Sequence, residues 1–212
     1  MPNHVYAHIS VEEKYADKLK EIAKVGLAQY YRPQPSELNE TSSPARIVSQ
    51  EEYDKQMKLN ETEKFKHYPL TEELHKELID KYGFDNWHDW NCAHWGTKWG
   101  CYENEMDGEQ YRFTTAWSPL SEDIIEMLAK DIPNFFYTYE EEQGWGAEME
   151  YVNGERSTYF EWDAPDFSET EHEGILFLEN DYQNGEGTFK KGYYADWCLH
   201  EYLGETWEKQ IN

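Results

Sequence analysis

The sequence predicts an α+β domain built on an antiparallel sheet of βαββαβ order, with helices on one face. The N-terminus shows a strand pattern followed by a helix pattern. Residues 100–162 show two strand patterns, then a helix pattern, then three strand patterns. Aromatic residues make up 17% of the 212 residues. This supplies a large core despite a mean hydropathy of −1.00. Together these observations favour the split βαβ plan with additions.

The N-terminal strand–helix pair covers residues 4–27. Residues 4–11, HVYAHISV, are rich in β-branched and aromatic side chains and predict a strand. Residues 12–27 repeat apolar side chains at helical spacing and predict an amphipathic helix that ends near Gly26; the stripe is Tyr15, Leu19, Ile22 and Ala23.

A helical insertion at about 45–83 follows this pair. Residues 31–44 predict a loop, because prolines and short polar residues fill them. Residues 49–65 predict a polar helix, and residues 70–83 predict a second helix. Thr71 is the expected N-cap of the second helix.

The second half of the sheet begins with a hairpin. Residues 100–106 and 109–117 predict strands that flank the turn dipeptide Asp107-Gly108. Residues 118–133 predict a helix with Ser121 as its N-cap and with Ile124, Ile125 and Leu128 facing the core.

Three further strands complete the predicted domain. They are expected at 134–142, 145–152 and 155–162, with Asn153-Gly154 turning the chain between the last two. We therefore predict one domain over residues 1–162.

An acidic, aromatic C-terminal extension over residues 163–212 is expected to pack on this domain. Residues 174–180 and 187–195 predict short strands, and residues 195–209 predict a helix.

The charge of the chain is strongly negative, at −25, and unevenly distributed. Residues 1–100 hold 17 acidic and 13 basic residues, whereas residues 101–212 hold 27 acidic and 6 basic residues. Such a charge repels nucleic acid and anionic membranes and attracts basic protein surfaces. Alternatively, the negative charge serves only to keep the protein soluble.

The remaining composition predicts a soluble protein of a cytoplasm. The three cysteines are an odd number, which favours reduced thiols. We find neither a signal-peptide pattern nor an apolar run long enough to cross a membrane, and we expect no cofactor.

Four segments of the sequence carry a family resemblance. They are MPNHV at 1–5, YYRPQPSELNETSSP at 30–44, WHDWNCAHWGTKW at 87–99, and the run FTTAWSPLSEDIIEMLAKDIPNFF onward at 113–155. In these four segments, which span most of residues 1–162, the chain resembles the YubB-like ferredoxin-like family of phage and plasmid proteins. The resemblance implies a ferredoxin-like fold without an iron–sulfur cluster, a mobile-element accessory gene expressed in the cytoplasm of a bacterial host, and no known reaction. It implies no catalytic residues, and the extension lies outside it.

The tryptophan-rich stretch at 85–99 has three interpretations. Cys92, His94, Cys101 and His88 could bind zinc, but they lack the paired tight spacing of structural zinc sites. A base-stacking platform needs neighbouring cations, and this stretch offers only Lys98. We therefore predict a structural role, with these side chains covering one face of the sheet: Trp87, Trp90, Trp95 and Trp99.

Acidic residues recur at alternate positions in the predicted strands and in the extension. Alternate residues of a strand share a face, roughly 6.8 Å apart. The candidate partner-binding residues are Glu103, Glu105, Asp107, Glu140, Glu141, Glu142, Glu148, Glu150, Asp163, Asp166, Glu169, Glu171 and Glu173. Two alternatives are a solvated outer face and a glycosidase carboxylate pair, although no pair stands out.

These observations predict a non-enzymatic binding protein. It would inhibit a host defence or DNA-handling protein by offering carboxylates to a basic surface, as a nucleic-acid mimic or an electrostatic plug. It would bind no nucleic acid directly. The alternatives are a metal-dependent hydrolase and a structural accessory protein that forms a homodimer.

Overall fold

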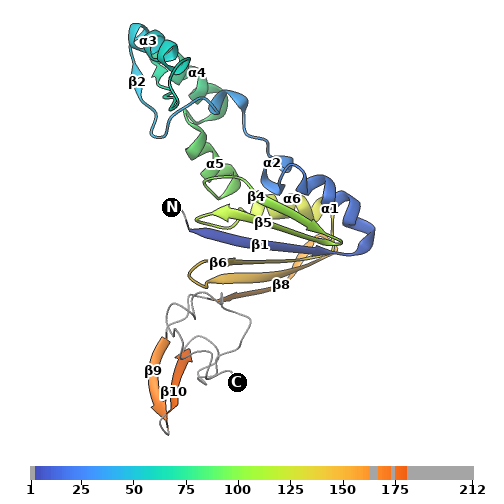
Figure 1. The fold of residues 1–212 in the computed structure, drawn as a ribbon. Helices are drawn as coiled ribbons and strands as arrows, with labels where there is room; N and C mark the ends of the chain where they lie inside the picture. Colours follow the sequence, from blue (N-terminus) through green and yellow to red (C-terminus); the bar gives the residue numbers. More distant parts are fainter. Residues whose placement is uncertain (1–2, 163–166, 173–174, 181–212) are drawn as a thin grey trace.

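The computed structural model describes residues 3–162, 167–172 and 175–180 of the chain (Figure 1). A six-stranded sheet forms its centre, in the order β4-β5-β1-β6-β7-β8, and every neighbouring pair in it is antiparallel. The fold is therefore mixed α+β, as predicted. The strands of this sheet are β1 (His4–Val11), β4 (Tyr102–Asp107), β5 (Gln110–Ala116), β6 (Phe135–Glu141), β7 (Gly146–Val152) and β8 (Glu155–Trp162).

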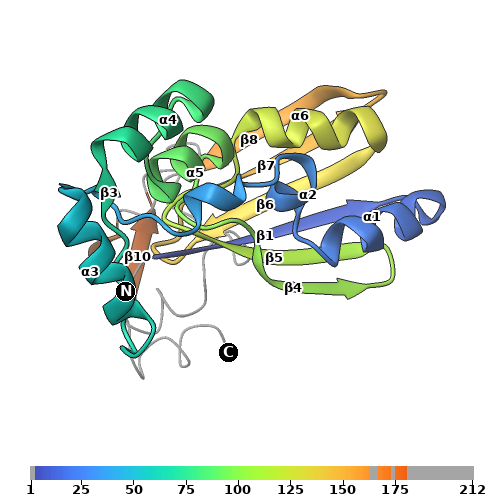
Figure 2. The same ribbon diagram turned by 90° about the horizontal axis from the view of Figure 1, so that it is seen from above.

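Three helices lie over one face of this sheet (Figure 2). They are α1 (Ala16–Ala23), which follows a 3₁₀ turn at Glu13–Tyr15, α2 (Leu27–Tyr31) and α6 (Glu122–Asp131). Gly26 has a φ of +96°, a conformation that favours glycine, and it separates α1 from α2. The helix predicted over 12–27 is thus shorter, and α2 was not predicted.

The core lies between these helices and the sheet. In β1 the side chains of Val5, Ala7 and Ile9 alternate toward the helices and are buried, as periodicity predicts. Tyr111 and Phe113 continue this layer on β5. Helix α6 adds its predicted apolar stripe from the helical layer. The three side chains of this stripe are all buried: Ile124, Ile125 and Leu128.

One predicted hairpin turn is confirmed, and the other is displaced by one residue. Asp107 is the last residue of β4 and pairs with Gln110, so the first turn consists of Gly108 and Glu109 rather than Asp107-Gly108, and Gly108 has a φ of +59°. β7 and β8 join at Asn153-Gly154, whose φ values of +56° and +83° fit the type I′ turn that matches strand twist.

The insertion contains helices, as predicted, and stands beyond one end of the sheet (Figures 1 and 2). Thr71 caps its second long helix, because its hydroxyl accepts a hydrogen bond from the Leu74 amide at 3.2 Å. Gly83, at a φ of +77°, ends that helix. The elements of this part are η2 (Ser36–Leu38), β2 (Ile47–Val48), α3 (Gln50–Asn60), β3 (Leu70–Thr71) and α4 (Glu72–Tyr82), and β2 pairs with β3 in parallel.

The tryptophan-rich stretch forms helix α5 (Trp87–Trp95), which was not predicted. Its Trp90 and Trp95 are buried in the core, and the Trp95 indole donates to the Arg32 carbonyl at 2.8 Å. Trp87 is half-buried, whereas Trp99 lies past the helix and is 38% exposed. The prediction of a core role therefore holds for Trp90 and Trp95 but is wrong for Trp99.

The described part of the C-terminal extension is a hairpin. Strand β9 (Phe167–His172) pairs antiparallel with β10 (Ile175–Asn180), and β10 matches the strand predicted at 174–180. The strand predicted at 187–195 and the helix predicted at 195–209 lie outside the described residues. Within those residues, no helix has the length and apolar character needed to cross a membrane.

Candidate protein-binding face

The sheet face opposite α1, α2 and α6 carries the polar side chains of the strands, and we call it the open face. In β1, His4, Tyr6, His8 and Ser10 point to it, because they alternate with the buried core residues. In Figure 1 the helices of the described residues lie above the sheet, on the side away from this face.

Most of the described candidate carboxylates gather on the open face. The β1–β6 register places Glu140 beside Tyr6, and the β6–β7 register places Glu148 and Glu150 on the same side. Alternation in β4 adds Glu105 and Asp107. The open-face carboxylates are Glu103, Glu105, Asp107, Glu140, Glu142, Glu148 and Glu150.

A β-bulge brings Glu103 to this face. The register between β4 and β5 shifts between Tyr102 and Glu105, so one extra residue is inserted on β4. Glu103 adopts a φ of +52°, and its carboxylate accepts a hydrogen bond from the Thr114 hydroxyl at 2.9 Å. Positive φ is costly for a residue with a side chain, so local strain accompanies this placement of the carboxylate.

The remaining candidate carboxylates do not belong to the described open face. The prediction that Glu141 is a surface residue is wrong, because its side chain points to the core side of β6 and is only 2% exposed. One of its oxygens accepts a hydrogen bond from the Gln143 amide at 2.7 Å, a local structural role. Glu169 and Glu171 occupy alternate positions of β9. Three candidates lie outside the described residues: Asp163, Asp166 and Glu173.

An aromatic cluster occupies the end of the open face where β1 begins. The Tyr102 ring lies 5.9 Å from the His4 ring and 6.0 Å from the Trp99 ring, between centroids. The His4 ring in turn stacks on Tyr6 at 6.3 Å. The Tyr102 hydroxyl lies 2.7 Å from His4 Nδ1 and donates to the Thr115 carbonyl, so this ring is held in place.

Lys98 extends the cluster to Trp117. Its ammonium lies 5.0 Å from the centroid of Trp99 and 4.4 Å from that of Trp117, within cation–π range of both. Trp117 has a φ of +71°, which is rare for a bulky residue. A hydrogen bond from the Trp117 amide to the Asn3 carbonyl, 2.9 Å long, holds this backbone.

The electrostatics of this end reflect its carboxylates. Partial burial, and then the charges of Glu103 and Glu142, raise the pKa of Tyr6. Burial and Glu103 are the leading causes that raise the pKa of Tyr102 to about 12. Both phenols therefore stay protonated at neutral pH, and negative potential surrounds the rings.

The cysteines and histidines near the tryptophan-rich stretch are dispersed. Cys92 is exposed and its sulfur lies 3.9 Å from His88 Nε2, whereas His94 stacks on Trp90. Cys101 is buried, and burial raises the pKa of its thiol to about 12. Among the residues that the structure describes, no three of these donor types are arranged to hold a metal ion.

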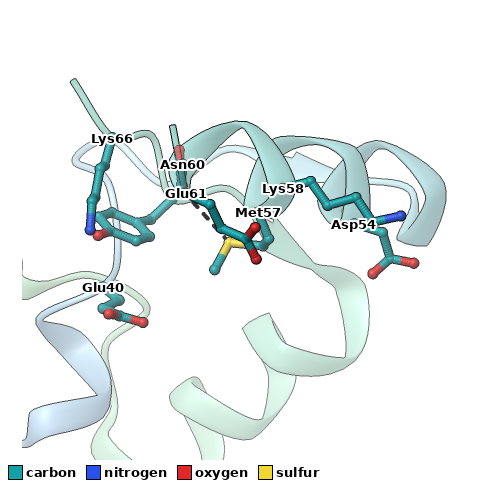
Figure 3. Close-up of a pocket in the computed structure, with 8 residues that line it drawn as sticks. Glu40, Asp54, Met57, Lys58, Asn60, Glu61 and Lys66 are labelled. Carbon is teal, nitrogen blue, oxygen red and sulfur yellow. Dashed lines mark hydrogen bonds between the residues drawn. The ribbon is translucent and has the colours of Figure 1, made fainter. Parts of the chain in front are cut away.

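The insertion carries a separate hollow of about 480 Å³ (Figure 3). The buried amide of Asn60 donates to the His67 carbonyl at 2.7 Å and accepts from the His67 amide at 3.1 Å, so its hydrogen bonds are already made. Charges of both signs line the hollow, which favours no ligand class: Glu40, Asp54, Lys58, Glu61 and Lys66. We therefore take the open face as the candidate site.

Sequence reasoning missed the aromatic members of the open face. Alternation along HVYAH was sufficient to place His4 and Tyr6 opposite the core residues of β1. Alternation along the strand predicted at 109–117 would place Trp117 on the face of Tyr111 and Phe113, but its positive φ turns it out of that layer, and it is 48% exposed. No sequence signal marked that turn.

Comparisons with protein-family models, with curated proteins and with solved structures each gave no match to this chain.

Proposed function

We propose that this chain is an acidic protein-binding accessory of a phage or other mobile element, which inhibits a host defence or nucleic-acid-handling protein. The observation that carries the proposal is the convergence of carboxylates from β4, β6 and β7 on the open face. Among the described strand residues of this face, Arg112 is the only arginine or lysine. The face is therefore strongly negative and fits a partner with a basic surface.

The fold that we propose for this protein is the ferredoxin-like βαββαβ plan, as in the YubB-like family. The order β4-β5-β1-β6 supports it, because β1 lies between the two strands that flank α6 in the chain. Strands β7 and β8 then extend the sheet at the β6 edge, and α1 and α6 lie on one face (Figure 2).

The two acidic edges of the open face suit a basic cleft or channel. Four inter-strand steps separate β4 from β7, so their carboxylate rows lie about 19 Å apart. A protein that normally holds nucleic acid presents lysine and arginine on both walls of such a channel. Exposed ion pairs are screened by salt, so the complex should weaken as ionic strength rises.

Affinity capture at two salt concentrations tests the proposal. The tagged full chain is incubated with lysate of the bacterial host at low and at high salt, and retained proteins are identified by mass spectrometry. We expect a basic nucleic-acid-handling protein that is retained at low salt and reduced at high salt.

Matched variants assign that binding to the open face. Glu148→Gln with Glu150→Gln removes two charges from β7, and Glu73→Gln with Glu77→Gln removes two exposed charges from α4. Because an exposed ion pair contributes about 0.2–1 kcal/mol, the β7 variant should bind the captured protein roughly 2- to 30-fold more weakly. Equal loss in both variants, or an affinity that is independent of salt, would contradict the proposal.

A further inference from the structure

We infer that the aromatic end of the open face binds guanidinium groups, so that the partner it fits presents arginine side chains rather than lysine side chains. This inference rests on the proposed function and specifies the chemistry of the partner. The aromatic end is defined by the rings of Tyr6, Tyr102, Trp99 and Trp117.

The rings at this end are accessible to a partner. Tyr6 is 50% exposed, Trp117 48% and Trp99 38%, although aromatic residues of this size are usually more buried. Tyrosine and tryptophan are also the side chains that contribute most at the centres of protein interfaces. Their exposure in one cluster therefore indicates a contact surface.

Carboxylates flank these rings. The Thr114 hydroxyl and the bulge hold Glu103 beside Tyr102, and the Glu142 carboxylate lies 3.9 Å from the His4 ring nitrogen Nε2. A guanidinium can stack its plane on an aromatic ring while its edge donates hydrogen bonds to a carboxylate. An ammonium is a strongly hydrated point charge without a planar edge, so it gains less from the same arrangement.

The chain already places one of its own cations on this cluster. Lys98 lies over both Trp99 and Trp117, which shows that these rings accept a cation at the edge of the acidic face. Lys98 lies over neither Tyr6 nor Tyr102 in the described structure, so we infer that these two rings receive the cations of a partner.

The backbone strain of the described chain is concentrated at this end. Three described residues other than glycine have positive φ, and Asn153 is explained by its type I′ turn. The other two, Glu103 and Trp117, both border the aromatic cluster. Strain of this kind persists where surrounding structure imposes it, and it often accompanies binding sites.

A phosphate-bearing ligand is the less favourable occupant. Rings that stack on nucleic-acid bases normally stand beside lysine and arginine, which neutralise the phosphates. Here the neighbouring charges are Glu103, Glu140 and Glu142, with Lys98 as the nearest cation. We therefore favour arginine and use an oligonucleotide as a control ligand.

Fluorescence anisotropy with two labelled peptides tests the inference. The probes are deca-arginine and deca-lysine, which carry equal charge, and a single-stranded deoxyoligonucleotide is the third ligand. We expect the full chain to bind deca-arginine roughly 5- to 30-fold more tightly than deca-lysine if two rings each contribute a stacking contact.

Two substitutions locate the preference. Tyr6→Thr removes an exposed ring from the open face, whereas Tyr159→Thr removes a ring of similar exposure, 48%, from the opposite face of β8. Of these two variants, Tyr6→Thr should lower the preference for arginine and Tyr159→Thr should not, while the salt-dependent binding of deca-lysine persists in both. Trp117→Asn is a second variant, because asparagine tolerates the φ of +71°. Circular dichroism checks that each variant is folded.

Each outcome separates this inference from the proposed function. Equal affinity for the two peptides overturns the inference but leaves an electrostatic binding face. A preference that survives in both Tyr6→Thr and Trp117→Asn also overturns it. Binding of the oligonucleotide would replace it with base stacking. Failure to bind either peptide at low salt would contradict the proposed function as well.

Discussion

Replacing Thr97 with valine would break the hydrogen bonds that join the end of α5 to the sheet. Thr97 is 1% exposed, and its hydroxyl donates to the Ala116 carbonyl at 2.7 Å and accepts from the Ala116 amide at 3.1 Å. These backbone groups lie past Thr114, the last residue of β5 that pairs with β4, so β4 does not supply their partners. The Thr97 hydroxyl satisfies both groups.

The expected cost follows from these two bonds. Valine has nearly the same shape as threonine, so it leaves no cavity, but it leaves a buried N–H and a buried C=O without their partner. Each such group costs about 1–3 kcal/mol, and we expect Thr97→Val to lower the free energy of unfolding by about 2–6 kcal/mol. Thr97→Ser keeps the hydroxyl and loses one methyl group, which costs about 1 kcal/mol.

Urea unfolding followed by tryptophan fluorescence measures both free energies, with unfolding monitored in parallel by circular dichroism. The order of the variants is decisive: valine should be worse than serine. If serine destabilises the protein as much as valine, or if valine costs less than about 0.5 kcal/mol, the hydroxyl does not hold this joint.

Three further outcomes are expected. Asn86→Ala should lower the free energy of unfolding by about 1–2 kcal/mol in the same urea assay. The reason is that Asn86 is 2% exposed and its side chain accepts a hydrogen bond from the Asp89 amide at the start of α5. An unchanged unfolding midpoint would contradict this capping role. Hydrogen bonds from Lys81 and Tyr82 lower the pKa of Glu37 to about 2, so its stabilising contribution is present above pH 4.5 and is lost as the pH falls toward 2. Glu37→Gln should flatten the dependence of thermal stability on pH in that window, and an identical profile would refute the assignment. In native protein at pH 8, iodoacetamide should label Cys92 and spare Cys101, as measured by peptide mass spectrometry. The reason is that Cys101 is buried and the pKa of its thiol is raised to about 12. Labelling of both cysteines at equal rates would show that the core opens.

Local sequence patterns predicted much of the fold. The strand at 4–11 is confirmed residue for residue, and Asn153-Gly154 does turn the chain between paired strands. The turn predicted at Asp107-Gly108 lies one residue later, at Gly108 and Glu109. Thr71 and Ser121 do precede helices, although Ser121 makes no capping hydrogen bond with its side chain. These features depend on a few neighbouring residues, so the sequence carries them directly.

Helix α5 shows where the interpretation of a pattern went wrong. Its aromatic composition suggested a wall against the sheet, but Asn86 before it and Gly96 after it are the usual residues of helix ends. Those two signals were sufficient to predict the helix. In the same way, strand alternation separates Glu141 from Glu140 and Glu142, and the run of three acids concealed it.

The sequence by itself determined the α+β class, the strand and turn positions of the second half, and an acidic surplus after residue 100. Tertiary structure alone decided that carboxylates from β4, β6 and β7 share one face and that Tyr6, Tyr102, Trp99 and Trp117 meet at its end. The physical reason is that turns and alternation are set by neighbours in the chain. Strand order, the bulge at Glu103 and the turn at Trp117 depend on contacts between segments about a hundred residues apart.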